Sequence, residues 1–239
     1  MLANDPKILN MKTIGIVGGT SWFSSVDYYR YINEMVNLAL GGDEAARLIL
    51  FSVNYGEIKK LTQADDWQGV RQIIAGAAQN LERAGADVVI LGANTMHYIF
   101  DQVEASIGIP MIHIADAVAK EIQKQSLKKV ALLGTKYTMQ LPFFAERLER
   151  FNIETIIPSE HDVEVINRSI YEELGKGIFT PETRKVYQSI ITKLKNEGAE
   201  GVILGCTEIP MLIKLTDSEL PVFDTTLIHS KAAVDFALN

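Results

Sequence analysis

The sequence predicts an α/β protein of two similar lobes, each built on a parallel β-sheet. Short apolar runs alternate along the chain with segments of helical periodicity, a pattern typical of βαβ units. The stretch "GADVVILG" from Gly85 returns as "GAEGVILG" from Gly198, at an offset of 113 (198 − 85 = 113). A similar apolar sequel follows each copy, "IPMIHIADAV" and then "LPVFDTTLI". The repeat indicates two pseudo-symmetric lobes, and we expect the active site in the cleft between them.

We expect the first lobe to contain residues 12–113 and 222–239. Its apolar runs end in glycine or polar residues, as buried strands that enter turns do. These predicted strands cover residues 13–19, 47–54 and 87–94. Apolar residues at helical spacing predict helices between them, over residues 24–40 and 67–85, and each of these ends at a glycine.

The second lobe, residues 114–221, is expected to repeat the same order of elements. The residues "KKVALLGTK" (128–136) correspond to "KTIGIVGGT" of the first lobe and predict its first strand. Shorter apolar runs predict strands at 154–159 and 200–207, and helical spacing predicts helices over 142–152, 164–179 and 181–199. The last helix is predicted to begin at Pro181 behind Thr180, because both residue types favour a helix start.

The composition excludes several classes of function. The chain has 239 residues, of which 47% are hydrophobic and 22% charged, as is usual for a globular protein. Its net charge of −7 argues against a nucleic-acid partner, because phosphate binding needs a basic face. Apolar runs are too short to cross a membrane. A single cysteine excludes an internal disulfide and favours a reducing cytoplasm.

The two matched strands end in small and hydroxyl-bearing residues, "GANT" at 92–95 and "GCTE" at 205–208. Backbone N–H groups of the helices that follow are expected to favour a carboxylate or phosphate, with side-chain hydrogen bonds from Asn94, Thr95 and Thr207. The same helix dipole would lower the pKa of Cys206 and prepare it to act as a base or nucleophile. Alternatively, Cys206 is a small buried apolar residue.

Other motifs do not point to a cofactor or a metal. The residues "GIVGGTS" lack the spacing of a dinucleotide-binding loop, and Asn54 stands where such a fold carries an acidic residue. The four histidines lack metal-ligand spacing. We expect Ser21 to cap the first helix and His97 to pack at the start of its own helix.

Four segments together carry a resemblance to a known family: "IGIVGGTSWFSSVDYYRYINE", "GANTMH", "INRSIYEELGKGIF" and "GVILGCTEIP". From Lys12 to the end, the chain resembles the aspartate/glutamate racemase superfamily, and most closely its aspartate racemase branch. The resemblance implies a cofactor-independent isomerase that binds a small acidic amino acid. Two cysteines of the family exchange the α-proton from opposite sides of the substrate. The resemblance also implies a homodimer.

Residues of the site are carried over from the family by position. Cys206 corresponds to the second catalytic cysteine, and Lys176 to a lysine that meets the carboxylate of an acidic substrate. The remaining positions that the resemblance places around the substrate are Thr20, Ser21, Asn54, Ala93, Asn94, Thr95, Thr135, Thr207 and Glu208.

Ala93 departs from the family pattern, because it stands where the first cysteine is expected. A methyl group cannot exchange a proton, so a symmetric reaction with two thiols is excluded. An asymmetric racemase that uses Cys206 alone is the function that we expect. A one-base decarboxylase or isomerase of the same scaffold and a non-catalytic dicarboxylate-binding protein remain alternatives, and Ala93 is either natural or an introduced Cys→Ala change.

Overall fold

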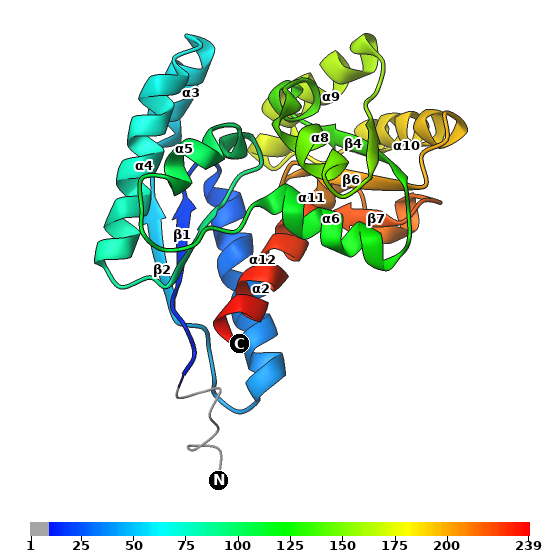
Figure 1. Ribbon diagram of the computed structural model, residues 1–239. Coiled ribbons are helices and arrows are strands. Elements are labelled where there is room, and N and C mark those ends of the chain that lie inside the picture. Colours follow the sequence, from blue (N-terminus) through cyan, green and yellow to red (C-terminus); the bar gives the residue numbers. More distant parts are fainter. Residues whose placement is uncertain (1–9) are drawn as a thin grey trace. The chain divides into compact units, whose positions relative to one another are not determined.

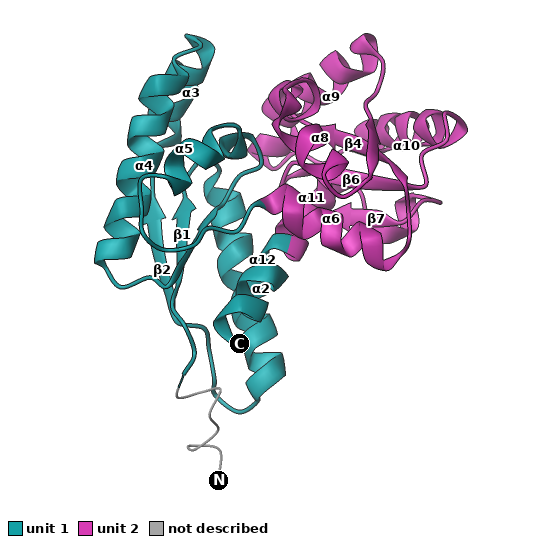
Figure 2. Ribbon diagram, viewed as in Figure 1, with its two compact units in different colours: residues 1–113, 229–239 teal, residues 114–228 magenta. Residues whose placement is uncertain are grey.

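A computed structural model describes residues 10–239 and confirms the α/β class, with a parallel sheet in each of two lobes. The chain divides into two compact units (Figure 2). The first ends at His113 and takes in His229–Asn239, and the second is Ile114–Ile228. Residues 222–228, which the sequence assigned to the first lobe, lie in the second unit, because their strand pairs with a strand of that unit.

Within residues 10–239, the first unit contains three parallel strands. Helices cover both faces of this sheet (Figure 1). The strands are β1 (Ile14–Gly18), β2 (Leu48–Ser52) and β3 (Val88–Leu91), in the order β2-β1-β3. Its helices are α2 (Trp22–Leu40), α3 (Tyr55–Gln63), α4 (Trp67–Arg83), the 3₁₀ helix η1 (Thr95–Ile99), α5 (Phe100–Glu104) and the last turns of α12 (Thr225–Ala237).

Alternation along β3 divides the core of this unit between the two faces of its sheet. Val88 and Ile90 pack in the same cluster as residues of α2 and α12, such as Tyr28. Val89 and Leu91 point to the other face and pack with residues of α4 and α5. A strand covered on both faces must be apolar throughout, which explains its uninterrupted run of valine, isoleucine and leucine.

The second unit contains four parallel strands in the order β5-β4-β6-β7. They are β4 (Lys129–Gly134), β5 (Glu154–Ile156), β6 (Gly201–Gly205) and β7 (Val222–Asp224). Its other elements are α6 (Ile114–Lys124), α7 (Lys136–Gln140), α8 (Pro142–Glu149), α9 (Glu160–Glu172), η2 (Leu174–Lys176), α10 (Pro181–Asn196), α11 (Ile209–Leu212) and η3 (Leu215–Asp217).

The helix expected over 164–179 differs from the structure at both ends. It begins earlier, at Glu160, where Ser159 caps it, and it ends at Glu172. The 3₁₀ turn η2 follows, and Gly177 leaves it with a φ of 74°, a value that glycine adopts without strain. The residues from Leu174 to Phe179 therefore form a connection between two helices.

The internal repeat appears in the backbone hydrogen bonds as well as in the sequence. Asp87 N–H donates to Thr13 O at 2.8 Å, and Glu200 N–H donates to Lys129 O at 2.8 Å. The side chains of the same two residues also make equivalent contacts. The Asp87 carboxylate accepts a hydrogen bond from the Thr13 N–H, and the Glu200 carboxylate accepts one from the Lys129 N–H. Matched residues therefore make matched contacts at the start of β3 and of β6.

No helix within residues 10–239 has both the length and the apolar character that a membrane-crossing helix needs.

Candidate active site

Cys206, Thr207 and Glu208 form a buried turn, here called the thiol turn, between β6 and α11 of the second unit. Their side chains are 7%, 8% and 6% exposed, respectively. The glycine before them is required by close packing, because a Cβ at Gly205 would lie 2.9 Å from the carbonyl oxygen of Leu133. The tight pairing of β6 with β4 therefore fixes the start of the turn.

The Glu208 carboxylate accepts hydrogen bonds from the other two side chains of the thiol turn. Cys206 Sγ donates to Glu208 Oε2 at 2.9 Å, and Thr207 Oγ1 donates to the same oxygen at 2.8 Å. An ionised carboxylate only accepts hydrogen bonds, so this geometry holds Cys206 as a thiol beside a group able to take its proton. It also gives the Thr207 hydroxyl a structural task, since that hydroxyl donates to Glu208.

Burial raises the pKa of the Cys206 thiol well above its usual range, and the negative charge of Glu208 raises it further. The expectation of a lowered pKa was therefore wrong. Hydrogen bonds from the Thr207 and Glu208 N–H groups do act in the expected direction, but the two other effects outweigh them. The helix that follows, α11, spans only Ile209–Leu212, so its dipole is small.

Tyr187 of α10 lies in the same buried cluster as Cys206, and no sequence pattern indicated that the two residues meet. Its hydroxyl lies 2.9 Å from Ser169 Oγ, which itself donates to Ile166 O at 2.8 Å. Because the Ser169 proton is used in this way, Tyr187 is the donor of the pair. Burial raises the pKa of Tyr187, and the nearby acidic side chains of Glu173 and Glu208 raise it further.

The matching turn of the first unit, "GANT", follows β3. Its Asn94 is 4% exposed, and Ala93 and Thr95 are partly buried. The helix that follows is the 3₁₀ helix η1, whose first residue is Thr95, and Asn94 does not cap it with its side chain. The two helices that follow this turn, η1 and α5, are both short, so the helix dipole that was expected to favour an anion here is small.

His97 packs at the start of its helix, as predicted. Its Nδ1 donates to the Ala93 carbonyl oxygen at 3.0 Å, since that oxygen can only accept. The His97 ring stacks on Phe100, and the rings of His113 and His229 lie 4.7 and 5.5 Å from it between centroids. Burial lowers the pKa of His229 to about 4.

Three predicted site residues act as helix caps at the ends of strands. Ser21 caps α2 by accepting from Ser24 N–H, which confirms the prediction, and Thr135 caps α7. Asn54 caps α3, and its exposed side chain also donates to Glu57. Parallel strands of one sheet end at one edge, so Asn54 and Ser21 lie at the edge from which the "GANT" turn also leaves.

Thr20 differs from these residues. It is 9% exposed, and within residues 10–239 its Oγ1 has no hydrogen-bond partner. The turn before it requires glycine, because Gly19 has a φ of 87° and a Cβ there would lie 2.2 Å from the Val53 carbonyl oxygen.

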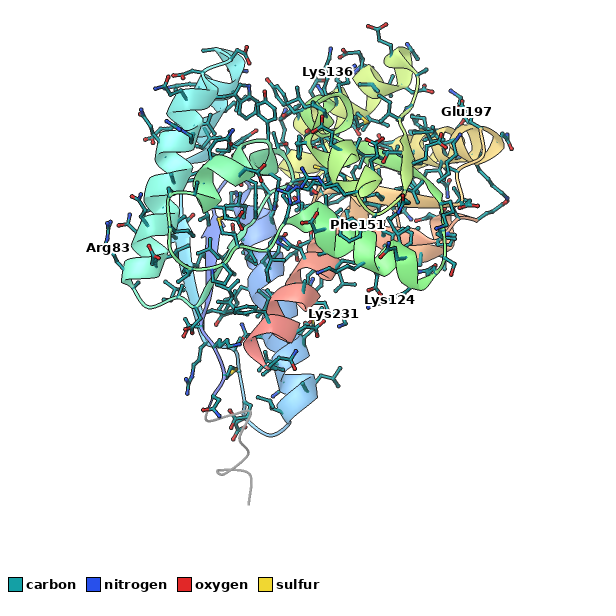
Figure 3. All side chains as sticks on the ribbon, viewed as in Figure 1. Arg83, Lys124, Lys136, Phe151, Glu197 and Lys231 are labelled. Atoms are coloured by element: carbon teal, nitrogen blue, oxygen red, sulfur yellow. The ribbon has the colours of Figure 1, made fainter. Side chains whose placement is uncertain are left out.

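In the second unit, Thr135 and Cys206 follow strands that are direct neighbours, because Gly134 pairs with Gly205. Lys136, labelled in Figure 3, forms an ion pair with Glu164 of α9. Lys176 lies exposed in η2, and η2 packs against α11, the helix that follows the thiol turn. The second unit therefore brings Thr135 and η2 to the neighbourhood of the thiol turn.

No group of three or more histidine, cysteine, aspartate or glutamate side chains within the described part of the chain is arranged to hold a metal ion.

Comparisons with known proteins show which family and which solved structures the chain resembles. Residues 17–233 match the profile of the family described as Asp/Glu/Hydantoin racemase. A crystal structure of a candidate Asp/Glu racemase from Yersinia pestis is similar, with 47% identity, 96% of this chain and 100% of that chain covered, and a TM-score of 0.91. PH1733, an aspartate racemase homologue from Pyrococcus horikoshii, has 39% identity at 96% and 100% coverage and a TM-score of 0.85. The broad specificity amino-acid racemase RacX of Bacillus subtilis is 25% identical over 169 residues, which are 71% of this chain and 73% of RacX.

Proposed function

The chain belongs to the Asp/Glu/Hydantoin racemase family, and we propose that it moves the α-proton of an acidic amino acid with Cys206. The observation that carries the proposal is the hydrogen bond from the buried Cys206 thiol to Glu208. Similarity to an aspartate racemase homologue supports aspartate or glutamate as the substrate class. The proposed enzyme is an isomerase that needs no organic cofactor, because the thiol and the carboxylate supply the proton transfer.

In the proposed reaction, Glu208 takes the Sγ proton and the resulting thiolate removes the α-proton of the substrate. The negative charge of the carbanion spreads into the α-carboxylate, and hydrogen-bond donors around that group stabilise it. Return of the proton from Sγ reverses the step. Proposed ligands of the substrate are Thr20, Ser21, Asn54, Ala93, Asn94, Thr95, Thr135, Lys176, Thr207 and Glu208.

The proposed reaction is asymmetric. Ala93 occupies the position that matches Cys206 in the other half of the repeat, and its methyl group has no exchangeable proton. Cys206 therefore serves only the enantiomer whose α-hydrogen faces it. Full inversion then needs a second proton source, such as water or a neighbouring hydroxyl, and is slower than exchange at the Cys206 side.

A panel of acids tests this function. Aspartate, glutamate, malonate-type acids and maleate would each be incubated with the protein in D₂O and followed by NMR and by chiral chromatography. We expect deuterium at the α-carbon of aspartate or glutamate. Loss of carbon dioxide or double-bond isomerisation would assign a lyase or isomerase of another kind, and thermal stabilisation by a dicarboxylate without any exchange would assign a binding protein.

We further propose that the protein is a cytoplasmic homodimer, as the family resemblance implies. Light scattering after size exclusion would then give about 53 kDa, twice the chain mass of 26.5 kDa. A mass near 26.5 kDa would contradict the dimer.

A further inference from the structure

The turn that carries Lys176 is held by a connected set of hydrogen bonds. Glu173, the residue after α9, accepts backbone bonds at its carbonyl oxygen from Lys176 N–H at 2.9 Å and from Ile178 N–H at 3.1 Å. Its side chain accepts a hydrogen bond at Oε2 from Thr183 Oγ1 of α10. One residue thus holds the turn from inside and ties it to the next helix.

Thr183 is fixed in turn by the cap of α10. Thr180 Oγ1 donates to Thr183 Oγ1 at 2.9 Å, and it accepts from Thr183 N–H at 3.1 Å. The protons therefore run in one direction, from Thr180 to Thr183 to Glu173. This series of hydrogen bonds links the two ends of the 174–179 connection, because Glu173 precedes the connection and Thr180 follows it.

The same turn lies beside the thiol turn. Leu174 is 1% exposed and belongs to the core cluster that contains Cys206 and Ile209. Gly175 approaches the backbone of α9 so closely that a Cβ would lie 2.9 Å from Ile170 O. The backbone of η2 is therefore anchored, while the Lys176 side chain at its end is exposed.

The hydroxyl of Thr183 also determines which group the Glu173 carboxylate interacts with. Glu173 and Lys176 are three residues apart, a spacing at which opposite charges readily pair. Within residues 10–239, however, Lys176 forms no ion pair, and the Glu173 carboxylate is bonded to Thr183 instead. The Lys176 ammonium therefore remains available to an anion from solution.

We propose that Glu173 is a positioning residue which, held by Thr183, sets the Lys176 turn so that it selects substrates with a second carboxylate. The inference rests on the proposed function, in which Lys176 meets that carboxylate. Neither Glu173 nor Thr183 need touch the substrate.

Removal of the Thr183 hydroxyl tests the proposal. Thr183→Val keeps the branched shape but removes the donor, and it frees Glu173 to pair with Lys176. We expect KM for aspartate to rise about tenfold, the size of one lost hydrogen bond to a charged group, with kcat changed less than about threefold. Thr183→Ser should restore the wild-type KM. Thr192→Val is the matched control on α10, because the Thr192 hydroxyl is exposed and donates only to Gln188 O of its own helix.

Two comparisons separate positioning from a general structural role. The inhibition constant of alanine, which lacks a second carboxylate, should not change in Thr183→Val. The effects of Thr183→Val and Lys176→Met on KM for aspartate should not add in the double variant, because both act through the Lys176 ammonium. Equal changes for aspartate and alanine, additive effects or an unchanged KM would overturn the proposal.

Hydrogen exchange keeps the test independent of catalysis. In Thr183→Val, protection of the Lys176 and Ile178 amides should fall, while protection in β6 stays at the wild-type level. Unchanged protection at Lys176 and Ile178 would overturn the role of Glu173 whatever the activity. If wild-type protein exchanges no acidic amino acid, the proposed function and the substrate-selecting part of the inference both fail, and the amide protection alone decides whether Glu173 sets the turn.

Discussion

The thiol of Cys206 donates a hydrogen bond of 2.9 Å to the carboxylate of Glu208, two residues further along the chain. A single buried turn therefore holds a thiol that can donate a proton and a carboxylate that can accept it. Because burial and the Glu208 charge both favour the protonated thiol, the resting pair is a thiol beside a carboxylate. Proton abstraction must begin with transfer from sulfur to oxygen.

Replacement of Glu208 by glutamine should separate acidity from activity. The neutral amide removes the charge that raises the pKa of Cys206, so the thiolate should form at lower pH, as seen by its ultraviolet absorbance or its alkylation rate. Exchange of the substrate α-proton should nevertheless slow by about 100-fold or more, because the base that takes the Sγ proton is lost. An alkylation profile that shifts to higher pH would contradict this account of the pair.

Exchange should vary little with pH in the neutral range. Transfer of the Sγ proton to Glu208 leaves the number of protons on the pair unchanged, and the pKa of Cys206 is raised above the usual 9.0, so the resting thiol persists throughout this range. We therefore expect kcat/KM for exchange, measured by deuterium incorporation at constant ionic strength, to stay nearly constant between about pH 6 and about pH 8. A steep rise across this range would show that the thiolate forms by loss of the Sγ proton to solvent instead of to Glu208.

The buried histidine of α12 should make the protein sensitive to mild acid. The folded pKa of His229 is about 4 against 6.5 for an ordinary histidine, so the unfolded chain binds the proton first. Its contribution to stability is complete above pH 6.5, decreases as the pH falls, and amounts to a loss of about 3 kcal/mol by pH 4.

Urea unfolding of the wild type and of His229→Gln at pH 7.5, 5.5 and 4.5 measures this contribution. The wild type should lose more stability between these values than His229→Gln. His161→Gln is the control, because His161 is exposed. Parallel losses in all three proteins would assign the acid sensitivity to other groups.

Two glycines with positive φ should differ in their response to alanine. Gly41 has a φ of 78° and open space around its missing side chain, so Gly41→Ala should cost about 1–3 kcal/mol from backbone strain alone. Gly19 has a φ of 87° and would also place a Cβ 2.2 Å from Val53 O. Gly19→Ala should therefore lower the urea midpoint much further, and equal midpoints would contradict the close packing of this turn.

The fold was largely predictable because its signals are local and repeated. The similar sequences around Asp87 and Glu200 predicted two equivalent strands, and in the structure both carboxylates make equivalent hydrogen bonds. The end of α9 was less predictable, because "ELGKGIF" continues the helical spacing of apolar residues while its two glycines end the helix.

The site was predictable in residue types but not in electrostatics. Sequence placed Cys206 at a strand end, where a helix dipole would make it more acidic. It could not show that Glu208 bends back onto the sulfur, or that α11 is too short to oppose the burial. Tyr187 and the Glu173–Thr183 pair were missed for a similar reason, because they meet only when α10 packs on α9.

Exchange measured separately for each enantiomer tests whether Cys206 alone carries the proton chemistry. L-aspartate and D-aspartate would be incubated separately in D₂O with wild-type protein and with Cys206→Ser, and deuterium at the α-carbon would be followed by NMR. We expect much faster incorporation into one enantiomer, and no incorporation above background with Cys206→Ser. Equal incorporation into both enantiomers, or full exchange by Cys206→Ser, would contradict this expectation.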